Sequence, residues 1–417
     1  MTNLSTLIGF GAGGSGSGSL PAIVTDVPTL VDSDSSYFRG SAYNQQGSPT
    51  YQAFHQLSTD GVFGGLFDPY YSAGGGVVGC GFYVNPATGS LGSLNTSSAV
   101  WNPGNAAIFS TCHHGACGMM VMNVGHNNNS SYSTNKGWVY AYSFSSTGVP
   151  QTGAQAAAPQ EAWPHSNGDL AMGMDNATSG TLYGRRSTYN SNNSRYYHSA
   201  NYATYNGSAS YSEWSDISSN TSTNYCTAAA KNSKGDLTPG GMICYYNSSG
   251  IQRISPIYGS TAARGSDYDA NLLGFASAIR GFHLSNGETL WYYDGKVAIQ
   301  SSSQLNVPGT TPAGVGLLTL INGTNQLRSC IPTNETDTWI CSTSGYGLIK
   351  LKIDINDNYK VTILGLYNTL GWLFTQSMNL SGTCLGLVGS NDEYLVYTAV
   401  SGGGLASRYV YENPFAS

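Results

Sequence analysis

Charged residues are scarce in this sequence. Lysine, arginine, aspartate and glutamate make up 9% of its 417 residues, whereas an ordinary soluble domain carries about 25%. Helices rely on glutamate, lysine and arginine, so their scarcity disfavours a helical protein. Apolar residues still make up 40% of the chain. That share is sufficient for a packed core, which excludes a disordered low-complexity protein.

Basic residues and long apolar runs are also lacking. The net charge is −6, and Arg39 is the only basic residue before Lys136, so the basic stripe that nucleic-acid binding needs is absent. Apolar segments such as Gly314–Ile321 are the length of a strand, and a membrane-spanning helix needs about 18 apolar residues or more. We therefore expect no nucleic-acid partner and no membrane insertion. The first 20 residues lack a basic n-region, so we expect no signal peptide.

Cysteines are too sparse for a disulfide scaffold in a chain of this length. The eight cysteines are Cys80, Cys112, Cys117, Cys226, Cys244, Cys330, Cys341 and Cys384. We expect most of them to be buried thiols. Two pairs, Cys112/Cys117 and Cys330/Cys341, are close enough in sequence to form a hairpin or loop disulfide if the geometry permits it.

Glycine and tyrosine are abundant instead, with 54 and 30 copies alongside many Ser, Asn and Thr. This composition favours turns and pleated surfaces and predicts an all-β fold. Short aromatic or β-branched segments recur at intervals of 47 to 60 residues, with anchors at Tyr83, Tyr140, Tyr197, Tyr245, Tyr292, Ile349 and Tyr409. A period near 50 is typical of propeller blades. We therefore predict a β-propeller of about seven blades, with the anchors on equivalent strands. A β-sandwich or an irregular β-rich fold is the alternative.

Turn signals support this interpretation. Asn286-Gly287 lies between two alternating apolar segments and predicts a β-hairpin. Pro86–Gly89, Ser146–Gly148 and Asn247–Gly250 also suit chain reversals. The segment Asp354–Asn358 begins like a calcium loop, but position six is Tyr359 and position twelve is Gly365, where such a loop needs Gly and Glu. We expect a hairpin turn there.

Three segments are distinguishable along the chain. Residues 1–20 contain an apolar head, with Leu4, Leu7, Ile8 and Phe10, followed by a Gly/Ser-rich run, which indicates a docking peptide on a flexible linker. Residues 21–60 are transitional and form either a small extra element or the first outer strand. We expect residues 61–417 to form the propeller domain.

Candidate metal-binding and catalytic residues are few. Cys112, His113, His114 and Cys117, with His126 nearby, gather suitable ligand types, but their spacing does not match a structural zinc site. We expect no metal and no cofactor. The sequence lacks a nucleophile elbow, a P-loop and a metalloprotease motif. Carboxylate pairs such as Asp267/Asp269 and Asp392/Glu393 are candidates for glycoside cleavage only by default, so we expect no enzymatic activity.

The segment from Tyr183 to Trp214 is rich in tyrosine among Asn, Ser and Arg. Rigid amphipathic aromatics among small polar groups make good recognition surfaces. The candidate binding residues are Arg185, Tyr189, Arg195, Tyr196, Tyr197, Tyr202, Tyr205 and Trp214. Packing between blades is the alternative explanation for at least half of these tyrosines.

The apolar peptide Asn3-Leu-Ser-Thr-Leu-Ile8, the linker after it and the charge-poor β domain together resemble tail-fibre and other decorating virion proteins of tailed bacteriophages. The resemblance implies localisation in the virion, attachment to tail or capsid proteins through the N-terminus, and a β domain that faces a glycan or protein on the host surface. A glycan-degrading enzyme on a propeller scaffold and a structural tail or capsid adaptor are the alternatives. A single apolar peptide binds only modestly, so attachment implies several linked tethers and a homo-oligomer.

Overall fold

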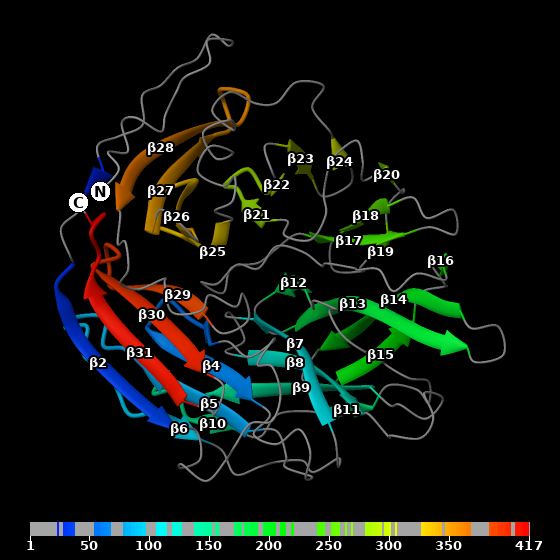
Figure 1. The fold of residues 1–417 in the computed structure, drawn as a ribbon, viewed down its shortest axis with the longest axis horizontal. Helices are drawn as coiled ribbons and strands as arrows, with labels where there is room; N and C mark the ends of the chain where they lie inside the picture. Colours follow the sequence, from blue (N-terminus) through cyan, green and yellow to red (C-terminus); the bar gives the residue numbers. More distant parts are fainter. Residues whose placement is uncertain are drawn as a thin grey trace.

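The structure is a computed structural model that describes residues 23–24, 28–37, 54–67, 78–96, 106–114, 119–126, 137–151, 155–157, 171–176, 179–190, 195–205, 209–213, 218–220, 240–246, 252–258, 263–264, 268–269, 280–293, 296–301, 305–306, 327–343, 347–367, 383–401 and 405–416. These residues form 31 β-strands and no helix. The strands gather in seven sheets of four or five strands each, and Figure 1 shows the sheets side by side in a ring.

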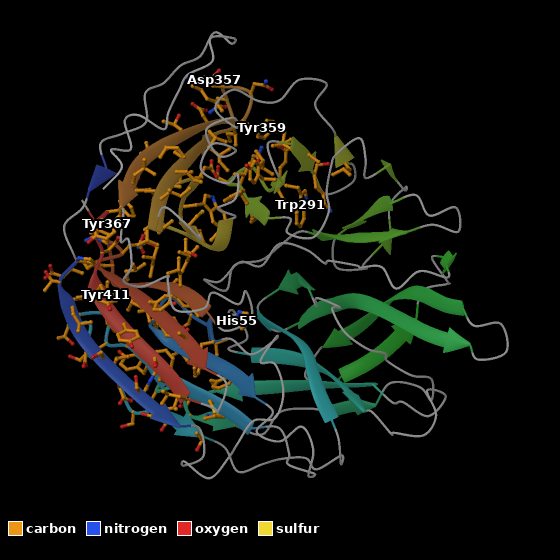
Figure 2. The ribbon with its side chains drawn as sticks, viewed as in Figure 1. His55, Trp291, Asp357, Tyr359, Tyr367 and Tyr411 are labelled. Atoms are coloured by element: carbon orange, nitrogen blue, oxygen red, sulfur yellow. The ribbon has the colours of Figure 1, made fainter. Side chains whose placement is uncertain are left out.

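This arrangement is a β-propeller, so the predicted fold class is confirmed and the alternative of a β-sandwich is wrong. The described sheets agree in number with the predicted count of about seven blades, which stays a prediction for the complete ring. Neighbouring sheets contact each other through their first strands, as β3 and β25 do with β29, and as β7 and β17 do with β12. In Figure 2, His55 on β3 accordingly lies near the centre of the ring and Tyr411 on β31 lies farther out.

Four sheets follow one another along the first two thirds of the chain. The first contains β3 (His55–Gln56), β4 (Val62–Phe67), β5 (Val78–Tyr83) and β6 (Asn95–Thr96). The second contains β7 (Ala106–His114), β8 (Met119–His126), β9 (Gly137–Phe144), β10 (Pro150–Gln151) and β11 (Gln155–Ala157). The third contains β12 (Ala171–Asn176), β13 (Ser179–Asn190), β14 (Arg195–Tyr205), β15 (Ala209–Glu213) and β16 (Ser218–Asn220). The fourth contains β17 (Gly240–Tyr246), β18 (Gln252–Tyr258), β19 (Ala263–Arg264) and β20 (Tyr268–Asp269).

Three further sheets complete the set. The fifth contains β21 (Arg280–His283), β22 (Thr289–Tyr293), β23 (Lys296–Gln300) and β24 (Leu305–Asn306). The sixth contains β25 (Leu327–Pro332), β26 (Thr338–Thr343), β27 (Gly347–Asp354) and β28 (Lys360–Tyr367), with β1 (Ile23–Val24) parallel to β28. The seventh, here the closing sheet, contains β29 (Thr383–Val388), β30 (Tyr394–Ser401), β31 (Leu405–Glu412) and, at its outer edge, β2 (Leu30–Tyr37).

The closing sheet joins segments from both ends of the described chain. β2 pairs antiparallel with β31, so part of the transitional stretch is an outer strand, one of the two possibilities that the sequence left open. β1, β2 and β3 all precede residue 61, which was the expected start of the propeller domain. The sheets therefore begin earlier than composition indicated, because the β2 sequence carries polar side chains that resemble those of a loop.

The predicted equivalence of the repeat anchors is wrong for two of them. Tyr83, Tyr140, Tyr197, Ile349 and Tyr409 each lie on the third strand of their sheets. Tyr245 instead lies on β17, the first strand described in its sheet, and Tyr292 lies on β22, the second. The anchors were chosen for aromatic content, which marks buried strands in general and does not distinguish the strands within one sheet.

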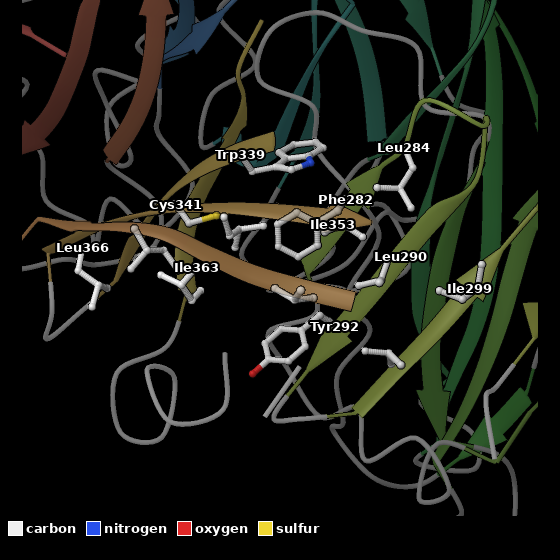
Figure 3. Packing of buried hydrophobic residues seen from close by; sticks show 14 residues of the cluster. Phe282, Leu284, Leu290, Tyr292, Ile299, Trp339, Cys341, Ile353, Ile363 and Leu366 are labelled. Carbon is white, nitrogen blue, oxygen red and sulfur yellow. The ribbon is translucent and has the colours of Figure 1, made fainter. Parts of the chain in front are cut away.

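The core lies between neighbouring sheets. Alternate residues of a strand point to opposite faces, and the β25–β28 sheet is buried on both of its faces. On one face, Trp339, Cys341 and Ile349 pack with the β21–β24 sheet (Figure 3). On the other face, Ile340 and Leu348 pack with the closing sheet. Each such side chain contributes roughly 1.5–3 kcal/mol by burial.

A third cluster packs the closing sheet against the β3–β6 sheet, with Phe63 and Phe82 facing Val396 and Val410. A buried amide links the same two sheets near the centre of the ring. Gln56 is fully buried; its Nε2 donates to the Leu387 carbonyl at 2.8 Å, and its Oε1 accepts from the Leu387 amide at 2.9 Å. The side chain of Gln56 thereby pairs the amide and carbonyl of Leu387, which lie on the inner edge of β29 and would otherwise lack partners from a neighbouring strand.

Arg408 of β31 stabilises the outer part of the closing sheet. Its side chain is fully buried, forms an ion pair with Asp34 of β2, and lies over the Phe82 ring at 5.3 Å from the ring centroid. It also donates to the Gly92 carbonyl at 3.2 Å. Burial lowers the pKa of Arg408 to about 10. One side chain thus joins β31 to β2 and to the neighbouring β3–β6 sheet.

Candidate functional site

The turns between the first and second strands share a backbone feature. In the four sheets whose first turn is described, a residue just before the second strand has a positive φ: Gly61 (89°), Gly287 (82°), Asp337 (52°) and Asp392 (58°). The left-handed backbone favours glycine, because a Cβ there costs roughly 1–2 kcal/mol, and aspartate is one of the few tolerated substitutes. In two sheets, the strained left-handed position is therefore occupied by an aspartate, which places a carboxylate at the turn.

Both carboxylates contact the preceding sheet. Asp337 accepts hydrogen bonds from the Ser285 amide and the Ser285 hydroxyl, both at 2.7 Å. Asp392 accepts from the Asn334 amide at 2.6 Å, and Asn334 Nδ2 in turn donates to the Ser390 carbonyl at 2.9 Å. Each aspartate therefore fixes its own turn to the first turn of the sheet before it.

A third link joins the β27–β28 turn to the same region. The Tyr359 hydroxyl donates to the Glu288 carboxylate, which also accepts from Asn286 Nδ2 at 2.7 Å. Burial and then the Glu288 carboxylate raise the pKa of Tyr359 to about 12. Figure 2 shows Tyr359 at the turn between β27 and β28, on the side of the β21–β24 sheet.

The first turns of the β21–β24 and β25–β28 sheets line an open groove of about 410 Å³ between these two sheets. Two carboxylates line it, without a lysine or arginine among its lining residues. The polar residues that line it are His283, Ser285, Thr333, Asn334, Glu335, Thr336, Asp337 and Thr338. The groove therefore offers hydroxyl, amide and carboxylate groups.

Both carboxylates of the groove are held by partners from the chain itself. Asp337 is fixed by Ser285, as described above, and Glu335 forms an ion pair with Lys350 Nζ at 2.5 Å. A carboxylate has about four acceptor sites, so each retains capacity for a further donor. The groove is thus a preorganised set of acceptors.

Trp339 lines the deeper part of the groove and is 1% exposed. Its ring packs edge-on against Phe282, with centroids 5.3 Å apart. The buried indole nitrogen lacks a hydrogen-bond partner among the described residues. A buried N–H without an acceptor costs about 1–3 kcal/mol, so this donor is unusual at the base of a polar groove.

The tyrosine-rich segment predicted as a binding surface lies in a different sheet. Arg185 and Tyr189 are on β13, and the antiparallel register places Tyr189 opposite Tyr196 and Asn190 opposite Arg195. The segment therefore forms one long hairpin, whose β14 also contains Tyr197, Tyr202 and Tyr205. Trp214 lies outside the described residues. A binding role for this segment stays a prediction.

The residues weighed as metal ligands, for which we expected no metal, are spread along a hairpin. Cys112, His113 and His114 lie at one end of β7, whereas His126 on β8 pairs with Ala106 at the other end. Six residues of strand separate these positions, or about 20 Å, so His126 does not join the other ligands. Cys117 lies outside the described residues. Within the described part of the chain, three or more potential metal ligands do not come together.

Asp392 and Glu393, considered above as a pair for glycoside cleavage, both have carboxylates that accept hydrogen bonds from the chain itself. Asp392 is 5% exposed and holds Asn334, as described above. Glu393 accepts from the Asn391 amide at 3.0 Å, and backbone hydrogen bonds of this turn lower the pKa of its carboxyl. In the other pair, Asp269 lies on β20 and Asp267 lies outside the described residues.

Predicted turns and attachment residues have mixed outcomes. The Asn286-Gly287 hairpin is confirmed, since the Leu284 amide donates to the Glu288 carbonyl at 2.8 Å. Asp354–Asn358 is also a hairpin turn, in which Asp354 Oδ1 accepts from the Asn356 amide at 2.9 Å. The proposed attachment residues Leu4, Leu7, Ile8 and Phe10 lie outside the described residues.

Sequence comparison adds no relatives: no family model matches the chain, and no curated protein is significantly similar to it. Among solved structures, the β-propeller domain of Cps50 (Swd1) from Myceliophteria thermophila is 6% identical, with a TM-score of 0.46 over 93% of this chain and 100% of that one. The β-propeller domain of the Trilobed protease from Pyrococcus furiosus is 7% identical, with a TM-score of 0.36 over 87% and 95%. These likenesses concern the fold alone.

An α-L-arabinofuranosidase from Fusarium graminearum is also similar, at 11% identity and a TM-score of 0.36 over 70% of this chain and 89% of that one. The similar structures thus differ in activity and assign none to this chain. In the part of the chain that the structure describes, no helix has the length and apolarity to cross a membrane.

The groove residues were missed by sequence reasoning because they meet only when two sheets pack side by side. Ser285 and Asp337 are 52 residues apart, and Asn334 and Asp392 are 58 apart. Both separations are close to the repeat interval. A hydroxyl or amide residue followed one repeat later by an aspartate just before a strand is therefore the signal that would have located these contacts.

Proposed function

We propose that this protein is a non-catalytic recognition protein of a phage particle, whose propeller binds a neutral glycan on the host surface. The groove between the β21–β24 and β25–β28 sheets carries the proposal. Its polar wall matches a ligand rich in hydroxyl groups, since sugar hydroxyls donate to carboxylates and accept from hydroxyl and amide donors. The groove is also preorganised, which lowers the entropic cost of binding.

The charge of the groove supports a neutral glycan over an acidic one. Glu335 and Asp337 line the groove, and the positive charge of Lys350 is already engaged by Glu335. A uronic or sialic acid would meet like charge there, which costs affinity. Neutral hexoses and N-acetylated sugars meet only dipoles and acceptors.

The partners of the two carboxylates support binding over catalysis. Glycoside cleavage needs one carboxyl to deliver a proton and a second to stabilise charge or activate water. Asp337 is engaged by two donors that join neighbouring sheets, and Glu335 is engaged by Lys350. Either residue would have to abandon a structural contact to transfer a proton.

The test is binding of the purified full-length protein to an array of neutral and acidic glycans, followed by calorimetry on the best ligand. Thr336→Arg places a long side chain at the groove wall and should lower affinity at least tenfold. Thr362→Arg is the matched control, because Thr362 is exposed on β28 away from the groove, and it should leave affinity unchanged.

Equal loss in both variants, or no loss in either, would place the glycan elsewhere, and the Tyr189–Tyr205 hairpin would be the next surface to mutate. A preference for acidic glycans would contradict the charge argument. Release of reducing sugar from the bound glycan would show an enzyme and overturn the non-catalytic part of the proposal.

The virion setting is supported by the sequence resemblance and by the apolar peptide at Leu4, Leu7, Ile8 and Phe10. Deleting residues 2–19 should abolish incorporation into particles and leave the melting temperature of the propeller unchanged, because the deleted segment precedes β1, the first strand that the structure describes. Normal occupancy of the truncated protein on particles would show that attachment runs through the propeller instead.

A further inference from the structure

Two cysteines lie directly opposite each other in the hairpin that forms one wall of the groove. Cys330 on β25 pairs with Cys341 on β26 in the antiparallel register. Both side chains face the β21–β24 sheet and pack in the same apolar cluster, and both are thiols in the structure. Figure 3 shows Cys341 within this cluster.

The hydrogen-bond pattern defines the kind of pair that they form. The Thr333 amide donates to the Thr338 carbonyl at 2.8 Å, which makes Thr333/Thr338 a hydrogen-bonded pair. Antiparallel pairs alternate, so Pro332/Trp339 is a non-hydrogen-bonded pair, as the missing N–H of proline requires. Two residues farther along, Cys330/Cys341 is again a non-hydrogen-bonded pair.

Non-hydrogen-bonded pairs are the closer ones, with Cα atoms about 4.5 Å apart. Disulfides span Cα separations of about 4.4–6.8 Å. The hairpin therefore holds the two thiols at a separation that a disulfide can bridge with little backbone movement. Their different exposure also gives them different roles, because Cys341 is fully buried whereas Cys330 is partly exposed.

We propose that Cys330 and Cys341 form a cross-strand disulfide when the protein meets a small-molecule disulfide such as oxidised glutathione. The Cys330 thiolate attacks one sulfur of the reagent, forms a mixed disulfide and releases one small thiolate. The Cys341 thiolate then attacks the Cys330 sulfur and releases the second. The two protein protons pass to the two released thiolates, so one disulfide is reduced as another forms.

The disulfide would cross-link β25 and β26 near the base of the turn that carries Glu335 and Asp337. It would close a short loop and restrict opening of the β25–β26 hairpin, whether or not the groove binds a glycan. An oxidising extracellular medium would favour this form, and a reducing cytoplasm would favour the dithiol. On the proposed virion function, the hairpin would be assembled as a dithiol and stiffened after release from the cell.

The test is to incubate the full-length protein with oxidised glutathione, block remaining thiols and map the cysteines by proteolysis and mass spectrometry. We expect a peptide in which Cys330 and Cys341 are linked, with the loss of two hydrogen masses. The melting temperature should rise by about 2–5 °C and return after a reductant is added.

Cys330→Ala and Cys341→Ala should each abolish both the linked peptide and the rise in melting temperature. Cys80→Ala is the matched control, because Cys80 is a buried thiol of another sheet, and it should retain both. Mapping of the unmodified chain does not depend on how the variants fold. A persistent glutathione adduct on Cys330, a link from Cys330 to another cysteine, or two unlinked thiols after oxidation would each overturn the proposal.

Discussion

The first turns of the β3–β6 and β21–β24 sheets place glycine at the left-handed position, whereas those of the β25–β28 and closing sheets place aspartate there. The glycine turns avoid backbone strain and make no carboxylate contact from that position. The aspartate turns accept the strain and gain a charged link to the preceding sheet. The difference shows that a turn residue with positive φ can simply reverse the chain when it is glycine. When it is aspartate, it can also link two neighbouring blades through its carboxylate.

The largest expected effect separates the two glycine turns from each other. A Cβ at Gly61 would lie 2.1 Å from the Val84 carbonyl oxygen, whereas a Cβ at Gly287 meets nothing within 4 Å. Gly61→Ala should lower the free energy of unfolding by about 3 kcal/mol or more, through backbone strain and the clash together. Gly287→Ala should lower it by about 1 kcal/mol, through strain alone. Urea denaturation of both variants measures the difference, and equal effects would contradict the steric argument.

The next effect concerns the two aspartate turns. Asp392 is 5% exposed, and Asp392→Ala removes the carboxylate that accepts from the Asn334 amide. This loss should lower the free energy of unfolding by about 2–3 kcal/mol. Asp337 is less buried and its hydrogen bonds are exposed, so Asp337→Ala should cost only about 1 kcal/mol. Thermal and urea unfolding would measure both, and a larger loss at Asp337 would reverse the predicted order.

Replacement by glycine sharpens the same comparison. Asp337→Gly loses the contacts of Asp337→Ala but removes the cost of a left-handed Cβ, so it should be more stable than the alanine variant by about 1 kcal/mol. The difference between the two variants in denaturation experiments isolates the strain. No difference would mean that the aspartate position carries no strain.

The smallest effect is a dependence on alkaline pH at the glycine turn of the β21–β24 sheet, where Glu288 meets Tyr359. Burial, reinforced by Glu288, raises the pKa of Tyr359 from 10.0 to about 12. The folded state therefore holds the proton more tightly than the unfolded state, so this contribution to stability is complete below pH 10 and is lost as the pH rises towards 12. Tyr359→Phe should make stability fall less steeply across that window.

Tyr397→Phe is the matched variant, because burial first and then Tyr409 raise the pKa of Tyr397 to about 12 as well. Each variant should remove part of the alkaline slope, and the double variant more than either. Urea denaturation at several pH values between 9 and 12 measures the slopes. An unchanged slope in Tyr359→Phe would show that its hydroxyl titrates equally in both states.

Local chemistry accounts for what could be predicted from the sequence. Asn286-Gly287 and the Asp354 turn were predictable because their side chains and backbone preferences act within a few residues. The repeat interval indicated the propeller, but the predicted equivalence of Tyr245 and Tyr292 to the other anchors was wrong, since aromatic residues occupy different strands in different sheets. Their shorter intervals, 48 and 47 residues, were already a sign of this.

The candidate site was less predictable than the fold. Ser285 and Asp337 come from different sheets, and only their spacing of about one repeat interval, not a local motif, connects them in the sequence. The tyrosine-rich segment was predicted as a binding surface from its composition. Composition reports residue types and gives no information on where two packed sheets form a groove. A groove depends on the packing of elements distant in sequence, and that information is absent from any local pattern.

The union of β2 with β31 has a consequence for biosynthesis. Ser35 and Ser407 hydrogen-bond across 372 residues, and at 5–20 residues per second a ribosome needs roughly 20–75 s to cover that distance. Throughout this interval the nascent β2 is a strand without its partner and is open to pairing with other chains. Its two aspartates, Asp32 and Asp34, and its three serines are the kind of residues that discourage such pairing. We therefore expect the same polar side chains that make this strand look like a loop in the sequence to reduce aggregation of the chain while it is being made.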